Sequence, residues 1–119
     1  MSNYKETTLI TSDRFVQTFS GVTPEVLANE IDASLLADGY SAKSGAPGDG
    51  IYNRGNKVVR ILLGAFYKYF EFYIRTETIE GGDTQLTVKK TTSGWSGGLI
   101  GVSQVKTELR RLEAKFKGL

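Results

Sequence analysis

The residue types that most often carry out chemistry in proteins are partly missing from this chain. It contains no cysteine and no histidine, and histidine is the commonest general base and transition-metal ligand. Within this chain, Ser-His-Asp and Cys-His catalysis and cysteine- or histidine-ligated zinc are therefore excluded. Carboxylates, lysines and oxygen-ligated hard cations remain, but the acidic residues match no catalytic or metal-binding template. We expect no enzyme activity, no catalytic residue, no cofactor and no metal.

The most informative pattern is an alternation of residue types between positions 66 and 77. Side chains alternate across an extended strand, so even and odd positions lie on opposite faces. The even positions are mostly phenylalanine, and we predict that they pack against the core. The odd positions form the candidate interaction face, which consists of Tyr67, Tyr69, Glu71, Tyr73 and Arg75.

Three interpretations of this tyrosine face stay open at the level of sequence. Its rings could stabilise the sheet through cross-strand pairs alone. They could form a protein interface, in which tyrosine and arginine are enriched. They could also line a ligand cavity or stack on nucleobases, and a set of basic residues could flank such a face: Arg60, Arg75, Lys89 and Lys90. The net charge of +2 is too small to indicate nucleic acid, so we expect none as a partner.

A second candidate is the glycine-rich loop that precedes the last predicted helix. It contains Gly94, Trp95, Gly97 and Gly98, and a glycine-rich loop before a helix can hold a phosphate. The segment has neither GxGxxG nor the P-loop spacing, and the bulky Leu99 follows it directly. We interpret it as a turn that brings the helix close to the sheet, with Trp95 closing one end of the core.

Two amphipathic helices are predicted. The first covers residues 24–38, with Thr23 as N-cap, Pro24 at the first helical position and Gly39 after the last turn. Its apolar stripe is formed by Leu27, Ile31 and Leu35. The second helix ends before Gly118, and its apolar stripe recurs at spacings of three and four residues: Val102, Val105, Leu109, Leu112 and Phe116.

The remaining chain reads as strands separated by turns. Extended segments are predicted at 7–19, 40–43, 51–53, 57–63, 66–77 and 84–90, and the first is interrupted near Ser12. Glycine-rich turns make most neighbours hairpins. The expected order is β-α-β-β-β-β-β-α, as one domain over residues 1–119. We predict an α+β fold with two layers: a mostly antiparallel, curved sheet of five or six strands and two helices packed on one face.

Charge is unevenly distributed along the chain. Residues 1–50 hold 3 Lys or Arg against 7 Asp or Glu, a net charge of −4, whereas residues 51–119 hold 12 against 6, a net of +6. The asymmetry indicates either a basic binding face or head-to-tail self-association, or two halves that mix in the fold. We favour the last. The start of the chain has no signal-peptide pattern, and no apolar run in the sequence is long enough to span a membrane, so we expect a cytoplasmic protein.

These patterns support two hypotheses about function. The first is a small non-enzymatic binding or assembly domain that contacts a protein partner, or itself as a homodimer, through the tyrosine face. The alternative is a carrier of a small hydrophobic ligand in a cavity between the sheet and the C-terminal helix. The orientation of the tyrosine face separates these hypotheses.

Overall fold

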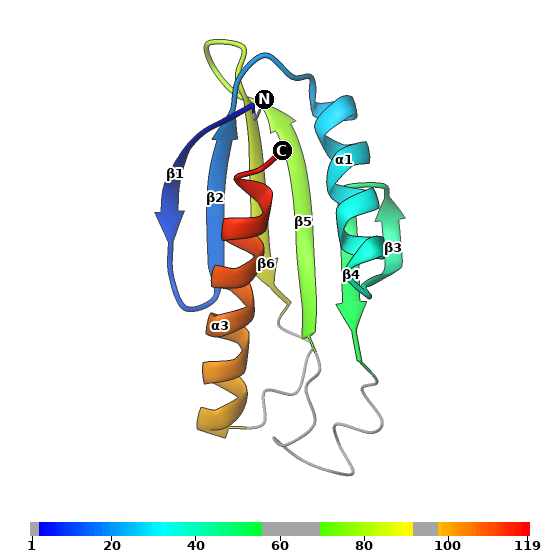
Figure 1. The fold of residues 1–119 in the computed structure, drawn as a ribbon, viewed down its shortest axis with the longest axis vertical. Coiled ribbons are helices and arrows are strands. Elements are labelled where there is room, and N and C mark those ends of the chain that lie inside the picture. Colours follow the sequence, from blue (N-terminus) through cyan, green and yellow to red (C-terminus); the bar gives the residue numbers. More distant parts are fainter. Residues whose placement is uncertain (1–2, 56–69, 92–97) are drawn as a thin grey trace.

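The protein has two layers, with its two described helices on one face of a six-stranded sheet (Figure 1). The computed structural model describes residues 3–55, 70–91 and 98–119, and in the last range it describes side chains from residue 103 onward. The strands are Tyr4–Ile10 (β1), Arg14–Phe19 (β2), Ser41–Ala46 (β3), Asp49–Arg54 (β4), Phe70–Thr78 (β5) and Thr84–Lys90 (β6). The helices are Pro24–Ala37 (α1) and Gly98–Phe116 (α3).

Every pair of neighbouring strands is antiparallel, in the order β1-β2-β6-β5-β4-β3. The predicted α+β class with an antiparallel sheet is therefore confirmed. Over the described residues the element order is β-β-α-β-β-β-β-α, which differs from the expected order at the start. The predicted strand at 57–63 and the first part of the one at 66–77 lie outside the described residues.

The difference at the start comes from the turn at residues 11–13. Here the predicted single segment folds back as the β1–β2 hairpin. The hydroxyl of Thr11 accepts hydrogen bonds from the backbone N–H groups of Asp13 (3.3 Å) and Arg14 (3.2 Å). Thr11 N–H donates to the Arg14 carbonyl at 2.9 Å. A side chain that satisfies turn N–H groups makes a tight turn stable without glycine or proline, so the hairpin lacks the usual glycine signal.

Helix α1 follows its sequence signals closely. The side chain of Thr23 accepts a hydrogen bond from Val26 N–H at 3.2 Å, and Pro24 is the first helical residue. Asp38 is the C-cap, and Gly39 adopts a left-handed φ of 92° directly after it. The predicted caps are thus confirmed at both ends, and the predicted apolar stripe is buried.

Helix α3 begins at Gly98, four residues before the first apolar position of its predicted stripe. Gly98, predicted to lie in the loop, is therefore the first residue of the helix. Residues added to a packed helix do not have to pass through the unfavourable nucleation step. The helix thus extends back through glycines whose intrinsic helix propensity is low.

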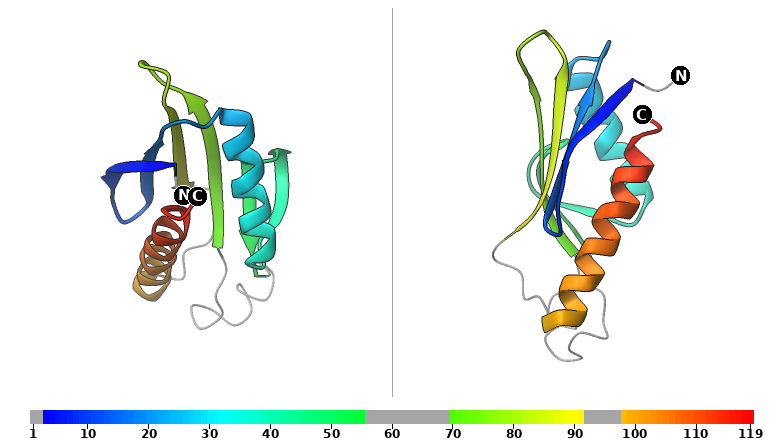
Figure 2. Two further views of the ribbon diagram at one scale, coloured as in Figure 1. Left: turned by 45° about the horizontal axis from the view of Figure 1, so that its top comes forward. Right: turned by 90° about the vertical axis from the view of Figure 1, so that its left-hand side faces the viewer.

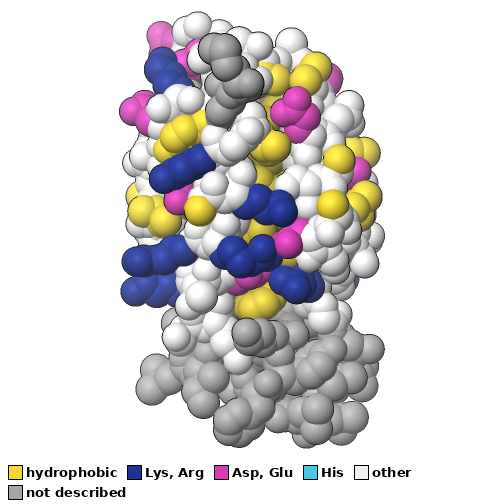
Figure 3. Space-filling view, viewed as in Figure 1, with side chains coloured by type: hydrophobic (Ala, Val, Ile, Leu, Met, Phe, Trp, Pro, Cys, Tyr) yellow, Lys and Arg dark blue, Asp and Glu magenta, His cyan; other side chains and the backbone are white. Residues whose placement is uncertain are grey.

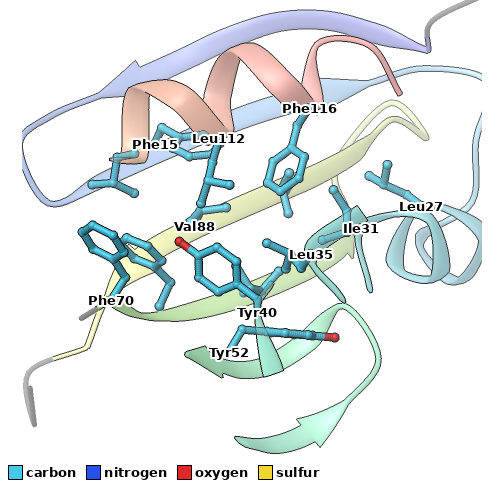
Figure 4. Close-up of a cluster of buried hydrophobic side chains, with 14 of the residues drawn as sticks. Phe15, Leu27, Ile31, Leu35, Tyr40, Tyr52, Phe70, Val88, Leu112 and Phe116 are labelled. Atoms are coloured by element: carbon cyan, nitrogen blue, oxygen red, sulfur yellow. The ribbon is translucent and has the colours of Figure 1, made fainter. Parts of the chain in front are cut away.

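The core fills the space between the helix layer and the sheet (Figure 4). The rings of Phe15 from β2 and Phe116 from α3 lie 6.3 Å apart, and the rings of Phe70 and Phe72 stack at 6.2 Å. Val105, Leu109 and Leu112 of α3 are buried in the same cluster. Aromatic and aliphatic side chains share this core, and their burial fixes which face of each strand points away from the helices.

Candidate functional site: the open face of the sheet

Strand β5 carries the predicted alternation. Phe70, Phe72 and Ile74 are buried on the helix side. Tyr73 is 39% exposed, and Arg75 is also exposed, on the opposite face. Neither described helix lies on that face, as the edge-on view shows (Figure 2, right). We call it the open face.

Other members of the predicted sites have different places. Tyr67, Tyr69, Gly94, Trp95 and Gly97 lie outside the described residues. Of the basic residues expected to flank the face, Arg60 also lies outside them. Lys89 pairs with Tyr73 across β6 and β5 and lies on the open face, whereas Lys90 pairs with Phe72 and lies on the helix side.

Glu71 lies on the open face by position, but its side chain is held within the protein. The residue is only 5% exposed. One carboxylate oxygen lies 2.8 Å from Lys43 Nζ, and the other accepts a hydrogen bond from the Thr91 hydroxyl at 2.6 Å. A buried carboxylate requires such partners. Glu71 therefore organises this end of the sheet and offers little surface to a partner.

The register of the strands arranges the open face into three rows that cross the sheet. The basic row is Arg14, Lys89, Tyr73 and Ile51. The middle row is Leu9, Val16, Thr87 and Arg75. The acidic row is Glu6, Thr18, Gln85 and Glu77. The basic and acidic rows are four residues apart along each strand, about 13 Å at about 3.3 Å per residue.

The charges of the basic row are only partly neutralised. Arg14 and Lys89 face each other on neighbouring strands, and like charges in this position are destabilising. Arg14 Nε lies 3.6 Å from the Asp13 carboxylate. Lys89 has no hydrogen-bond or ion-pair partner among the described residues. Within the described residues, Lys89 is thus a partly exposed cation without a paired carboxylate, opposite the exposed Tyr73.

Apolar side chains lie among these charges. Leu9 is 44% exposed at the edge of the middle row, and Val16 and Ile51 are half-buried. Leu9, Val16 and Arg14 were missed in the sequence because the first hairpin was read as one segment. Without that hairpin, nothing placed them beside β6. The alternation of residue types over 84–90 does predict that Lys89 shares a face with Gln85 and Thr87.

A second cluster, on the helix side, was not anticipated from the sequence. Glu108 of α3 is only 6% exposed. Its carboxylate accepts hydrogen bonds from the Tyr40 hydroxyl at 2.5 Å and from Arg111 Nε and Nη2, each at 2.8 Å. Arg111 Nη1 also donates to Asp38 at 3.1 Å. The network ties α3 to the C-terminal end of α1 through residues far apart in the chain.

The chemistry of this network is structural. Burial and the hydrogen bond to Glu108 raise the pKa of the Tyr40 hydroxyl well above its ordinary value. The hydrogen bond from Arg111 lowers the pKa of the Asp38 carboxyl below its usual range. Both shifts move the pKa values of these groups further from neutral pH, whereas an acid–base catalyst needs a pKa near neutral pH. We therefore place the candidate site on the open face.

The helix side is basic over α3. Figure 3 views this side and shows Lys and Arg side chains gathered at mid-height. The basic residues of α3 with described side chains are exposed: Lys106, Arg110, Arg111 and Lys115. Its acidic residues in the same range are buried: Glu108 and Glu113. Asp38 of the acidic half of the chain meets Arg111 and Lys115 of the basic half. The two halves therefore mix at this contact, but the exposed cations of α3 remain.

No known protein family, curated protein or solved structure matches the chain. Within residues 3–55, 70–91 and 98–119, no cluster of three or more potential metal ligands is present. In the same part of the chain, neither helix combines the length and the apolar character that crossing a membrane requires.

Proposed function

We propose that this chain is a small, non-enzymatic binding and assembly domain that contacts a protein partner through the open face of the sheet. The observation that carries the proposal is the position of Tyr73. The residue is 39% exposed, on the face opposite both helices, with Arg75 two residues further along β5 on that face. Exposed tyrosine and arginine on a sheet face that neither described helix covers are typical of contact cores.

The mixture of residue types favours a protein over a nucleic acid. A phosphate backbone is attracted by a continuous basic surface, whereas the open face carries Glu6 and Glu77 along one row. Those carboxylates would repel phosphates. Exposed Leu9 and half-buried Val16 between the charged rows offer apolar area, which protein interfaces bury at their centre.

The alternative of a hydrophobic-ligand carrier receives less support. The space between the sheet and α3 is occupied by fully buried side chains of the core: Phe15, Leu109, Leu112 and Phe116. Protein interiors are packed as densely as organic crystals, so a ligand would have to displace these side chains. The open face needs no such rearrangement to bind a partner.

Site-specific photo-crosslinking tests the proposal. The full-length chain is produced with a benzophenone amino acid at position 73 or, as a control, at position 33, because Ala33 lies on the exposed side of α1. We expect a covalent protein adduct from position 73 and none from position 33. The adduct should disappear when Thr87→Arg places a long charged side chain in the middle row. Absence of an adduct at position 73, or equal adducts from both positions, would overturn the proposal.

A further inference from the structure

The three rows of the open face are complementary to themselves. Cations lie at one end of the strands, carboxylates at the other, and apolar side chains with Thr87 and Arg75 between them. We propose that the partner of the open face is a second copy of this chain, related to the first by a two-fold axis that crosses the strands at the middle row. This inference rests on the proposed function and names its partner.

The charge pattern selects this axis over its alternative. A two-fold axis across the strands turns the second copy end for end, so that each basic row lies over the acidic row of the other copy. An axis parallel to the strands would place the basic row of one copy over the basic row of the other, and like charges held close together cost several kcal/mol. Only the first arrangement brings Lys89 towards Glu77 of the second copy.

The middle row meets itself in this pair. Leu9 and Val16 of one copy approach the same apolar side chains of the other, which buries the exposed part of Leu9. Arg75 also approaches its equivalent, but each guanidinium lies 3.5 Å from Glu77 of its own chain, which reduces the repulsion. Packed sheets keep their strands within about 30° of each other at a spacing of about 10 Å, a distance that long charged side chains can bridge.

The pair also offsets an unfavourable juxtaposition of like charges within the single chain. Arg14 and Lys89 are directly opposite on β2 and β6, and Lys89 has no partner among the described residues. In the pair, the second copy supplies carboxylates from Glu6 and Glu77 to this basic row. An isologous interface forms each such contact twice, so a modest gain for one contact is doubled in the dimer.

Charge reversal at one site in each row tests the pairing. Lys89→Glu alone and Glu77→Lys alone each place like charges together twice in the dimer, and we expect each to raise the dimer dissociation constant about tenfold or more. An equal mixture of the two variants restores opposite charges, because each K89E copy then meets an E77K copy. Sedimentation velocity over a wide concentration range should show the mixture associating within about threefold of the unmodified chain.

Compensation within one chain does not explain such a rescue. Lys89 and Glu77 lie in different rows, about 13 Å apart along the strands, and in the mixture the two substitutions are on different molecules. Lys106→Glu on α3 and Glu30→Lys on α1 are matched controls, because both residues lie on the helix side. Neither control should change the dissociation constant. Thermal unfolding of every variant establishes that it is folded.

The outcomes separate this inference from the proposed function. If the unmodified chain remains monomeric, or if K89E and E77K associate as well as it does, the second copy is not the partner. A crosslinked adduct from position 73 that contains a different protein would also overturn the inference and leave the proposed function standing. A position-73 adduct at twice the mass of the chain, with rescue in the mixture, supports both.

Discussion

The hydroxyl groups of Tyr40 and Tyr52 both end on carboxylates of other elements. Tyr40 donates to Glu108 of α3, and Tyr52 of β4 donates to Asp32 of α1. Both side chains are buried, so their rings fill the core while their hydroxyls tie the two layers together. Tyr73 is exposed on the open face and does not join the two layers. At the residue scale, the same amino acid is therefore structural in two places and available for contact in a third.

Tyr40→Phe should be much more destabilising than Tyr73→Phe. The first substitution removes one hydrogen bond from the buried carboxylate of Glu108 and leaves it with Arg111 and, at 3.7 Å, Arg54. A hydrogen bond to a charged group contributes about 1.5–3 kcal/mol, so we expect the free energy of unfolding to fall by about 2 kcal/mol. The exposed Tyr73→Phe control should change it by less than about 0.5 kcal/mol. Urea unfolding measures both, and equal losses would contradict a tie at Glu108.

At the scale of elements, the β3–β4 turn is fitted against α1. Gly48 in this turn is buried and has a φ of +67°. A Cβ atom built there would lie 2.4 Å from the Cα atom and the carbonyl oxygen of Ala28 in α1. The N–H of Gly48 donates to the hydroxyl of Tyr52 at 2.8 Å. The turn, β4 and α1 therefore meet at a point that accepts no side chain.

Gly48→Ala should lower stability well beyond the effect of Gly81→Ala. Gly81 in the β5–β6 turn also has a positive φ, of +95°, but a Cβ atom there meets nothing within 4 Å. Both substitutions carry the left-handed backbone cost of about 1–2 kcal/mol. Gly48→Ala adds a clash with helix backbone, which we expect to cost about 2 kcal/mol more. Chemical unfolding of the two variants gives the difference, and similar values would show that the turn moves freely against α1.

The elements were predictable where a local signal exists. Thr23, Pro24 and Gly39 mark the ends of α1, and these signals act within a few residues of the boundary. The β5–β6 hairpin was marked in the same way by Gly81 and Gly82. Near Ser12 a break was predicted but not the reversal of the chain, because the β1–β2 turn depends on the side chain of Thr11, and threonine is common in strands as well as in turns. The start of α3 was missed because propagation from a packed helix overrides the low propensity of glycine.

The site was predictable only in part because it depends on pairing between distant strands. Alternation along one strand places Tyr73 and Arg75 on a common face without any knowledge of the fold. The basic and acidic rows need the register of β1, β2, β5 and β6, which no single segment encodes. The Glu108–Tyr40 bond likewise joins residues that are 68 positions apart.

At the scale of the whole molecule, the proposed dimer makes opposite predictions for salt in two forms of the same surface. The unmodified faces attract each other through the basic and acidic rows, so added salt should weaken their association. Two K89E copies repel each other at the same contacts, so added salt should strengthen theirs. The screening length is about 10 Å at 0.1 M salt, similar to the spacing of packed sheets, and falls to about 3 Å at 1 M salt. Charges on facing sheets therefore interact at the lower salt concentration and are screened at the higher one. Sedimentation at both concentrations measures the two slopes. Slopes of the same sign would mean that apolar contacts alone hold the copies together and that the charged rows do not face each other.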